Sequence, residues 1–304
     1  MTIVISGASG AFGQKATKQL LETVDPSKLI LVTRSPDKLA QFAAGGVQVR
    51  YGDLDQPETV REAFKGGDKL LLISTLDVGE RRRRQLLAAV DAAKAAGVGH
   101  VVYTSSVGIF PRNPAYVVTD HLYTEELLRA SGLAWTFMRD AQYAEVITTM
   151  MAPLALATGK WESSAKDGCM AFVSKQDCVD CAVAVLSRPG HENAAYEITG
   201  PELLSFRDCA RITAEVYDKP IQYLDISHEQ MQANFDAAGV PRKYTDGMHS
   251  ERGASWGSEE MMSYEQAIRE SWFAVASHHV KHILGRPARS LREVLQATRG
   301  ARYV

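Results

Sequence analysis

The stretch VISGASGAFGQKATKQLL, residues 4–21, decides the fold class of this chain. A β-branched apolar run leads into three glycines spaced G-x-x-G-x-x-G, and a helical pattern follows. Glycines let the backbone turn tightly and approach a pyrophosphate, which binds the free N–H groups at a helix N-terminus. The spacing alone is a weak signal, but at the first β–α turn of an alternating chain it indicates a dinucleotide site. The predicted cofactor-binding loop consists of Gly7, Ser9, Gly10, Ala11, Phe12 and Gly13.

The alternation of strands and helices continues through the first half of the chain. Runs of aliphatic, β-branched and aromatic residues predict strands at 2–6, 29–33, 47–51, 69–74, 100–105 and 134–138. Helical patterns lie between most of them, at 11–23, 36–44, 57–65, 80–96 and 116–131. Apolar strands that alternate with helices indicate a parallel sheet covered on both faces. We therefore predict an α/β fold with a Rossmann-type, doubly wound sheet.

The pattern changes after about residue 140. Further helices are predicted at 140–159, 173–190, 205–219 and over most of 228–285, with one more strand at 195–199. We predict an NAD(P)-binding domain at 1–150, to which later segments return, and a smaller, mainly helical substrate-binding lobe at 151–304. The polar, glycine-containing region 240–265 fits either a lid over the cleft or a surface loop.

The end of the second predicted strand selects the form of the cofactor. An NAD-specific protein needs a carboxylate there for the ribose 2′-hydroxyl, but LILVTRSPDK has Thr33, Arg34 and Ser35 at this place. Arg34, with Lys38 one turn later, suits a 2′-phosphate through charge-assisted hydrogen bonds. The alternative is a solvated loop arginine. We predict NADPH (NADP) as the cofactor.

Polar residues also follow other strands at the edge where open α/β sheets bind ligands. Asp53 and Leu54 follow the third strand and are candidate neighbours of the adenine. Ser74 and Thr75 follow the fourth strand, near the expected diphosphate or ribose, and Ser105 follows the fifth. All five are predicted to contact the cofactor, Ser105 at the nicotinamide ribose or at the substrate.

Charge and cysteine usage restrict the partners. A net charge of −2 provides no basic field for nucleic acid or an anionic membrane. No apolar stretch is long enough to span a bilayer, and four cysteines do not make a disulfide framework, so a cytoplasmic protein is expected. We expect no metal, because Cys178 and Cys181 have the helical spacing of packed residues. The arginine run ERRRRQ, residues 80–85, is expected to be a solvated helix start.

Several stretches resemble the NmrA-like atypical short-chain dehydrogenase/reductase family, especially its triphenylmethane reductase and type 2 NADPH-dependent quinone reductase branches. The matching motifs are GASGAFG, TRSPDK, DHLYTEELLRASGLAWTFMRDAQY and LGRPARSLRE. The resemblance covers essentially the whole chain, and the block at 120–143 is its most specific part. It implies a Rossmann-type domain, a small C-terminal lobe and a substrate cleft between them.

The resemblance also gives a role to the helix at 116–131. Ordinary short-chain dehydrogenases use Tyr-x-x-x-Lys there, whereas this chain has His121 at the Tyr position and Glu125 at the Lys position. A histidine suits proton donation near neutral pH, and a carboxylate one turn away would favour its protonated form. The alternative is a simple i,i+4 pair on a helix. Tyr143 follows the sixth strand and is the predicted substrate-facing aromatic, with a packed, hydrogen-bonded tyrosine as the alternative.

These observations predict an NADPH-dependent oxidoreductase that transfers hydride to a quinone, a dye or another conjugated aromatic acceptor. His121 and Tyr143 are the candidate catalytic residues, and the partner is a small molecule. Two alternatives remain: a non-catalytic NADP(H) sensor that acts through a protein partner, and a reductase or isomerase of a specific aromatic natural product. The oligomeric state, monomer or homodimer, stays open.

Overall fold

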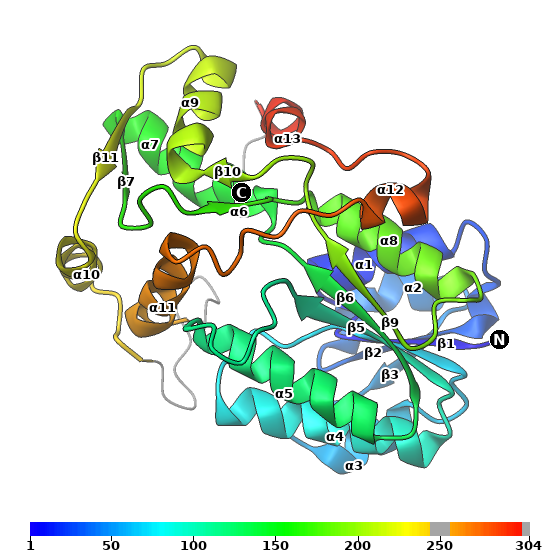
Figure 1. Ribbon diagram of the computed structural model, residues 1–304. Helices are drawn as coiled ribbons and strands as arrows, with labels where there is room; N and C mark the ends of the chain where they lie inside the picture. The colour runs from blue at the N-terminus through cyan, green and yellow to red at the C-terminus, as the bar shows by residue number, and fades with distance from the viewer. Residues whose placement is uncertain (244–255, 300–304) are drawn as a thin grey trace. The chain divides into compact units, whose positions relative to one another are not determined.

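The computed structural model describes residues 1–243 and 256–299. Its main feature is a seven-stranded sheet with the order β3-β2-β1-β4-β5-β6-β9 (Figure 1). From β3 to β5 neighbouring strands pair in parallel. The strands are β1 (Ile3–Ser6), β2 (Leu29–Thr33), β3 (Gln48–Tyr51), β4 (Lys69–Leu72), β5 (His100–Ser106), β6 (Ala134–Asp140) and β9 (Ala194–Ile198). The chain order reverses beside β1, which is the doubly wound arrangement predicted from the sequence.

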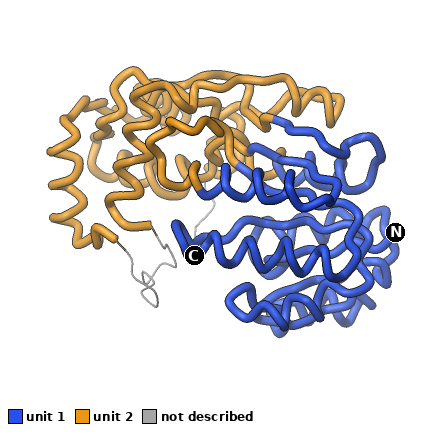
Figure 2. The backbone as a smooth tube through the Cα atoms, turned by 60° about the horizontal axis from the view of Figure 1, so that its bottom comes forward, with its two compact units in different colours: residues 1–105, 120–139, 178–196 blue, residues 106–119, 140–177, 197–304 orange. Residues whose placement is uncertain are grey.

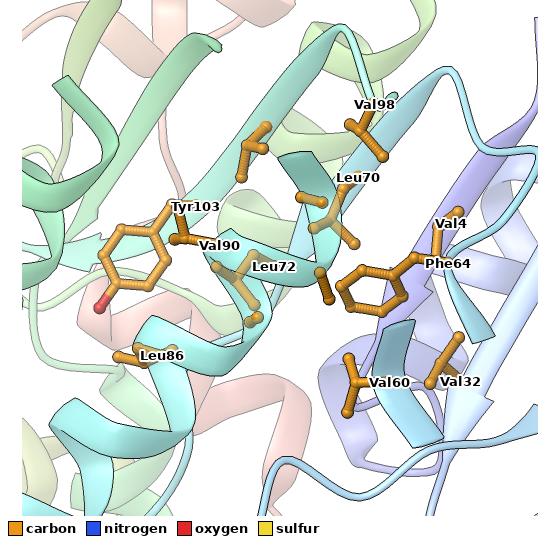
Figure 3. Packing of buried hydrophobic residues seen from close by; sticks show 14 of the residues in the cluster. Val4, Val32, Val60, Phe64, Leu70, Leu72, Leu86, Val90, Val98 and Tyr103 are labelled. Atoms are coloured by element: carbon orange, nitrogen blue, oxygen red, sulfur yellow. The ribbon is translucent and has the colours of Figure 1, made fainter. Parts of the chain in front are cut away.

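Helices cover both faces of this sheet, with α3, α4 and α5 on one face and α1, α2 and α8 on the other (Figure 1). They are α1 (Ala11–Leu20), α2 (Ala40–Ala44), α3 (Pro57–Ala63), α4 (Glu80–Ala96), α5 (Tyr116–Ala130) and α8 (Lys175–Ser187). A buried cluster fills the space between the sheet and α3 and α4, and includes Phe64, Leu72 and Leu86 (Figure 3). In the same view Tyr103 extends from β5 past Leu86 and Val90 of α4. Burial of this apolar surface is the main source of stability for the sheet.

The chain forms two compact units (Figure 2). Unit 1 contains residues 1–105, 120–139 and 178–196, and unit 2 contains residues 106–119 and 140–177 together with the described part of the chain from 197 onward. The first long passage into unit 2 therefore occurs after Arg139 rather than after residue 150. The reason is that the helical segment starting at Ala144 packs among elements of unit 2.

Unit 2 is mainly helical and also contains two small sheets. β7 (Lys160–Ser163) pairs in parallel with β11 (Gln222–Asp225), and β8 (Cys169–Met170) pairs antiparallel with β10 (Leu204–Ser205). Its helical segments are α6 (Ala144–Val146), a π-helical turn (Ile147–Met151), α7 (Ala152–Thr158), α9 (Phe206–Tyr217), α10 (His228–Ala237), α11 (Ser258–Arg269), α12 (His279–Leu284) and α13 (Leu291–Thr298). The four short strands escaped prediction because two to four residues show no periodicity.

The region 240–265 was expected to be one loop or lid, and this is wrong for its last part. Residues 258–265 belong to α11, which starts after Gly257 with Glu259 and Glu260 in its first turn. Acidic side chains in the first turn favour a helix through its dipole. Residues 244–255 lie outside the described part of the chain. Over the described residues, no helix has the length and apolar content needed to cross a bilayer.

Candidate functional site

The glycine loop between β1 and α1 presents backbone rather than side chains. Gly7 has φ +74°, a conformation that favours glycine. A Cβ on Gly13 would lie 2.7 Å from the Ala8 Cα and 2.8 Å from the Gly7 carbonyl oxygen, so the loop and helix approach too closely for a side chain. Gly10 is the N-cap of α1 and provides no side-chain cap. The first N–H groups of α1 are therefore available to an anion, as a bound pyrophosphate requires.

The end of β2 is joined to the glycine loop by a chain of hydroxyl groups. Thr33 Oγ1 donates to Ser9 Oγ at 2.7 Å and accepts from the Ser35 backbone N–H at 3.0 Å. Arg34 and Lys38 are exposed beside this chain, and within the described residues neither side chain forms an ion pair or hydrogen bond. Two free cations next to the glycine loop fit the predicted 2′-phosphate site.

The residues after β3 are engaged locally. The Asp53 carboxylate accepts from the Asp55 backbone N–H at 3.1 Å, and the Asp53 N–H donates to Thr59 Oγ1 at 2.9 Å. Leu54 packs against the hydrophobic cluster. Asp53 therefore shapes its own turn, and a contact of either residue with the adenine stays a prediction.

The residues after β4 differ from one another in their partners. The Ser74 backbone N–H donates to Thr104 Oγ1 at 2.8 Å. Thr75 Oγ1 is buried and has no hydrogen-bond partner among the described residues. Because a buried hydroxyl without a partner is costly, Thr75 fits a contact with a bound cofactor.

The Glu125 carboxylate on α5 is fully buried and has several partners. Oε1 accepts from Ser105 Oγ at 2.7 Å and from Arg139 Nε at 2.8 Å. Oε2 accepts from Arg139 Nη2 at 2.7 Å and from Arg129 Nη2 at 3.1 Å. The predicted pairing of Glu125 with His121 is therefore wrong, because two arginines and a serine occupy the carboxylate.

His121 instead faces Arg82 and Tyr103. Its Nε2 lies 2.7 Å from Arg82 Nη2, and its Nδ1 lies 2.9 Å from the Tyr103 hydroxyl. A guanidinium can only donate, so Nε2 accepts and Nδ1 carries the proton. Burial and the Arg82 charge hold the pKa of His121 well below its usual value. The expectation that its protonated form is favoured is therefore wrong.

The arginine run at the start of α4 is not a solvated segment. Arg82 is 2% exposed, Arg81 pairs with Asp55 at 2.7 Å and Arg83 pairs with Asp120 at 2.7 Å. Only Arg84 of the four keeps most of its side chain exposed, at 63%. The net charge of the chain does not reveal these ion pairs, because the acidic partners of Arg81 and Arg83 lie far away in the sequence.

Tyr143 lies in unit 2, where its hydroxyl donates to Asp140 Oδ2 at 3.0 Å. Lys175 Nζ lies 5.1 Å from the centre of the Tyr143 ring, and the ring is half-buried. Its contact with a substrate stays a prediction. The side chains of Cys178 and Cys181 are buried on α8, as their helical spacing indicated. Among the described residues no group of His, Cys, Asp and Glu could hold a metal ion.

The site geometry defines a dinucleotide-binding domain, and comparisons with known proteins agree. A family model described as NAD(P)H-binding matches residues 7–189. The chain is 33% identical to quinone oxidoreductase 2 of Escherichia coli over 256 residues, which is 84% of this chain and 88% of that protein. It is 28% identical to the NAD(P)H azoreductase of Xenophilus azovorans over 295 residues, 97% of each. The solved structure of the Escherichia coli quinone oxidoreductase QOR2 complexed with NADPH matches with a TM-score of 0.88 and 29% identity, covering 98% of this chain and 100% of that one.

The chain belongs to the NAD(P)H-binding family, within its NmrA-like branch of atypical short-chain dehydrogenase/reductases. The predicted fold, the predicted class of NAD(P)H-dependent reductase and the predicted NAD(P)H cofactor are thereby confirmed, and the preference for NADPH stays a prediction.

Proposed function

We propose that this reductase transfers hydride from NADPH to an electron-poor conjugated acceptor, namely a quinone or a synthetic dye. The observation that carries the proposal is the enclosure of His121, whose two ring nitrogens contact Arg82 and Tyr103. By the family resemblance, His121 stands where ordinary short-chain dehydrogenases have their proton-donating tyrosine. A carbonyl reductase needs a proton at the oxygen as hydride arrives. A quinone or cationic dye accepts hydride and delocalises the electron pair, so its proton, where one is needed, comes from solvent. Relatives named as quinone oxidoreductase and azoreductase support the same acceptor class.

The residues of the glycine loop bind the diphosphate through their N–H groups in this proposal. Arg34 and Lys38 bind the 2′-phosphate and confer the preference for NADPH over NADH. Thr75 and Ser105 contact the riboses or the diphosphate between them. When bound, the nicotinamide supplies the hydride, and the chain supplies its orientation. Tyr143 of unit 2 is proposed to contact the acceptor.

The test follows NADPH oxidation against quinones, triphenylmethane dyes, azo dyes and aromatic carbonyls. Turnover with quinones or dyes and none with simple carbonyls is expected. Turnover with carbonyls alone would contradict the proposal, because a proton donor would then be required. Tight NADPH binding without any turnover would favour the sensor. Replacement of Tyr143 by Phe and by Ala checks the acceptor contact: the acceptor KM should rise for Ala and stay near wild type for Phe.

A further inference from the structure

The segment 73–79, between β4 and α4, lies beside the glycine loop. β4 pairs with β1, and a Cβ on Gly7 would lie 3.5 Å from the Ile73 Cβ. Thr75, with its buried and unpartnered hydroxyl, stands two residues further on. A buried hydroxyl group destabilises the folded protein unless it forms a hydrogen bond. The position of this segment therefore decides where that hydroxyl points relative to a bound dinucleotide.

Side chains of β5, α4 and α5 hold the segment on both sides of Thr75. Thr104 accepts from the Ser74 N–H, as described above. After Thr75, Arg82 Nη1 donates to the Asp77 carbonyl oxygen at 3.5 Å, and Asp120 Oδ2 accepts from the Gly79 N–H at 2.6 Å. Gly79 has φ +78° and ψ −147°, which a residue with a side chain rarely adopts. The shape of the segment is thus imposed by its anchors.

Two adjacent residues of α5 provide or support the later anchors. Asp120 is fully buried, and its Oδ1 also accepts from Arg83 Nε. His121 Nε2 accepts a hydrogen bond from Arg82, and within the described residues Arg82 forms no ion pair. A buried guanidinium without a carboxylate depends on such a neutral acceptor to fix its position.

The charged and titratable groups around His121 can be named element by element. Arg82 of α4 and Tyr103 of β5 contact its two ring nitrogens. On α5, the Asp120 carboxylate contacts Gly79 and Arg83. The Glu125 carboxylate contacts Arg129 and Arg139. No proton donor or acceptor other than Arg82 and Tyr103 contacts the ring within the described chain.

We propose that Asp120 and His121 are positioning residues for the cofactor: they hold segment 73–79, His121 through Arg82, so that the Thr75 hydroxyl binds NADPH. The inference rests on the proposed cofactor contacts and is independent of the acceptor. It assigns the start of α5 to cofactor binding and not to proton transfer. The lowered pKa of His121 is consistent with this role, because a guanidinium can donate a hydrogen bond only to the uncharged ring.

The first test is a double-mutant cycle on NADPH binding by the full chain, measured by fluorescence titration. Thr75→Val should raise the NADPH Kd about tenfold, the value of one hydrogen bond, and Thr75→Ser should restore it. Asp120→Ala should weaken binding similarly, and the double variant should be no worse than either single one. Arg84→Gln, which changes an exposed arginine of α4, is the control. Additive losses in the double variant would overturn the proposal.

The second test separates positioning from proton donation. His121→Asn should raise the NADPH KM and leave kcat at saturating NADPH within about twofold, whereas loss of a general acid lowers kcat by about a hundredfold or more. In the wild type, the His121 ring signals in NMR should not shift between pH 5.5 and 8. A kcat loss of that size, or titration near pH 6.5, would overturn the proposal. If Asp120→Ala does not fold, Asp120→Asn replaces it in the cycle. If no acceptor is turned over at all, the reductase proposal fails, but binding and NMR still decide this one.

Discussion

The glycine loop and the buried polar layer around α5 are both in unit 1 but work by opposite means. The loop presents backbone N–H groups at the start of α1, and Gly13 leaves no room there for a side chain. The layer, defined as Arg82, Asp120, His121 and Glu125, acts through side chains that are almost completely enclosed. The difference predicts that changes in either region alter cofactor binding, and that changes in the layer cause the larger loss of stability in unit 1.

Glu125→Ala should have the largest effect. It removes the carboxylate that Arg139, Arg129 and Ser105 share, and leaves charged groups without their partner. Breaking a buried ion pair costs about 3–5 kcal/mol in the free energy of unfolding. Chemical denaturation monitored by circular dichroism measures this loss. Glu126→Ala, an exposed neighbour on the same helix, is the matched control. Equal stabilities of the two variants would show that the layer does not stabilise unit 1.

His100 extends the comparison to a buried histidine of β5. Burial, with a smaller contribution from the Lys69 charge, lowers its pKa to about 4. Between pH 6.5 and about 4, His100 therefore binds a proton in the unfolded chain but not in the folded chain. Stability is therefore complete above pH 6.5 and is lost as pH falls toward 4, by about 1.4 kcal/mol per pH unit and roughly 3 kcal/mol in total. The stability of His100→Gln, measured over the same pH range, should lack this component. Parallel pH curves for both proteins would contradict the expectation.

Gly13→Ala examines the loop. The new methyl group would overlap the Ala8 backbone, so the loop must shift away from α1. We expect a NADPH Kd at least tenfold higher and a loss of about 1–3 kcal/mol in stability. Gly99→Ala, whose Cβ would lie 3.6 Å from its nearest neighbour, should resemble the wild type in both measurements. Unchanged NADPH binding in Gly13→Ala would remove the loop from the cofactor site.

Arg34→Ala should have the smallest effect on the fold. Charge-assisted hydrogen bonds contribute about 1.5–3 kcal/mol, so the NADPH Kd should rise roughly 10–100-fold while the NADH Kd stays the same. The melting temperature should not change, because the side chain is exposed. Arg61→Ala, another exposed arginine of unit 1, is the control. A similar loss for NADPH and NADH would mean that Arg34 does not read the 2′-phosphate.

The sequence predicted the features that depend on local pattern. The glycine spacing, the apolar strands and the cations after β2 each follow from a few neighbouring residues. The partners of buried charges do not, because Arg82 meets His121 and Asp55 meets Arg81 across long stretches of chain. An i,i+4 spacing suggested that Glu125 contacts His121, but α5 carries both into the interior, where other elements supply better partners. The sequence feature that could have indicated these pairs is the run of arginines near the start of α4, together with the acidic residues Asp120 and Glu125 on α5.

The exposure of Arg34 and Lys38 has a consequence for how this protein can change over generations. Both are exposed at a short turn that includes the 3-10 helix Pro36–Leu39, and neither side chain forms an ion pair or hydrogen bond in the described chain. If these two residues select the cofactor as proposed, a substitution at the surface is enough to change the preference between NADPH and NADH. The enclosed charges behind it must change together or not at all. In evolution, cofactor preference can therefore change through fewer substitutions than the buried charged residues can.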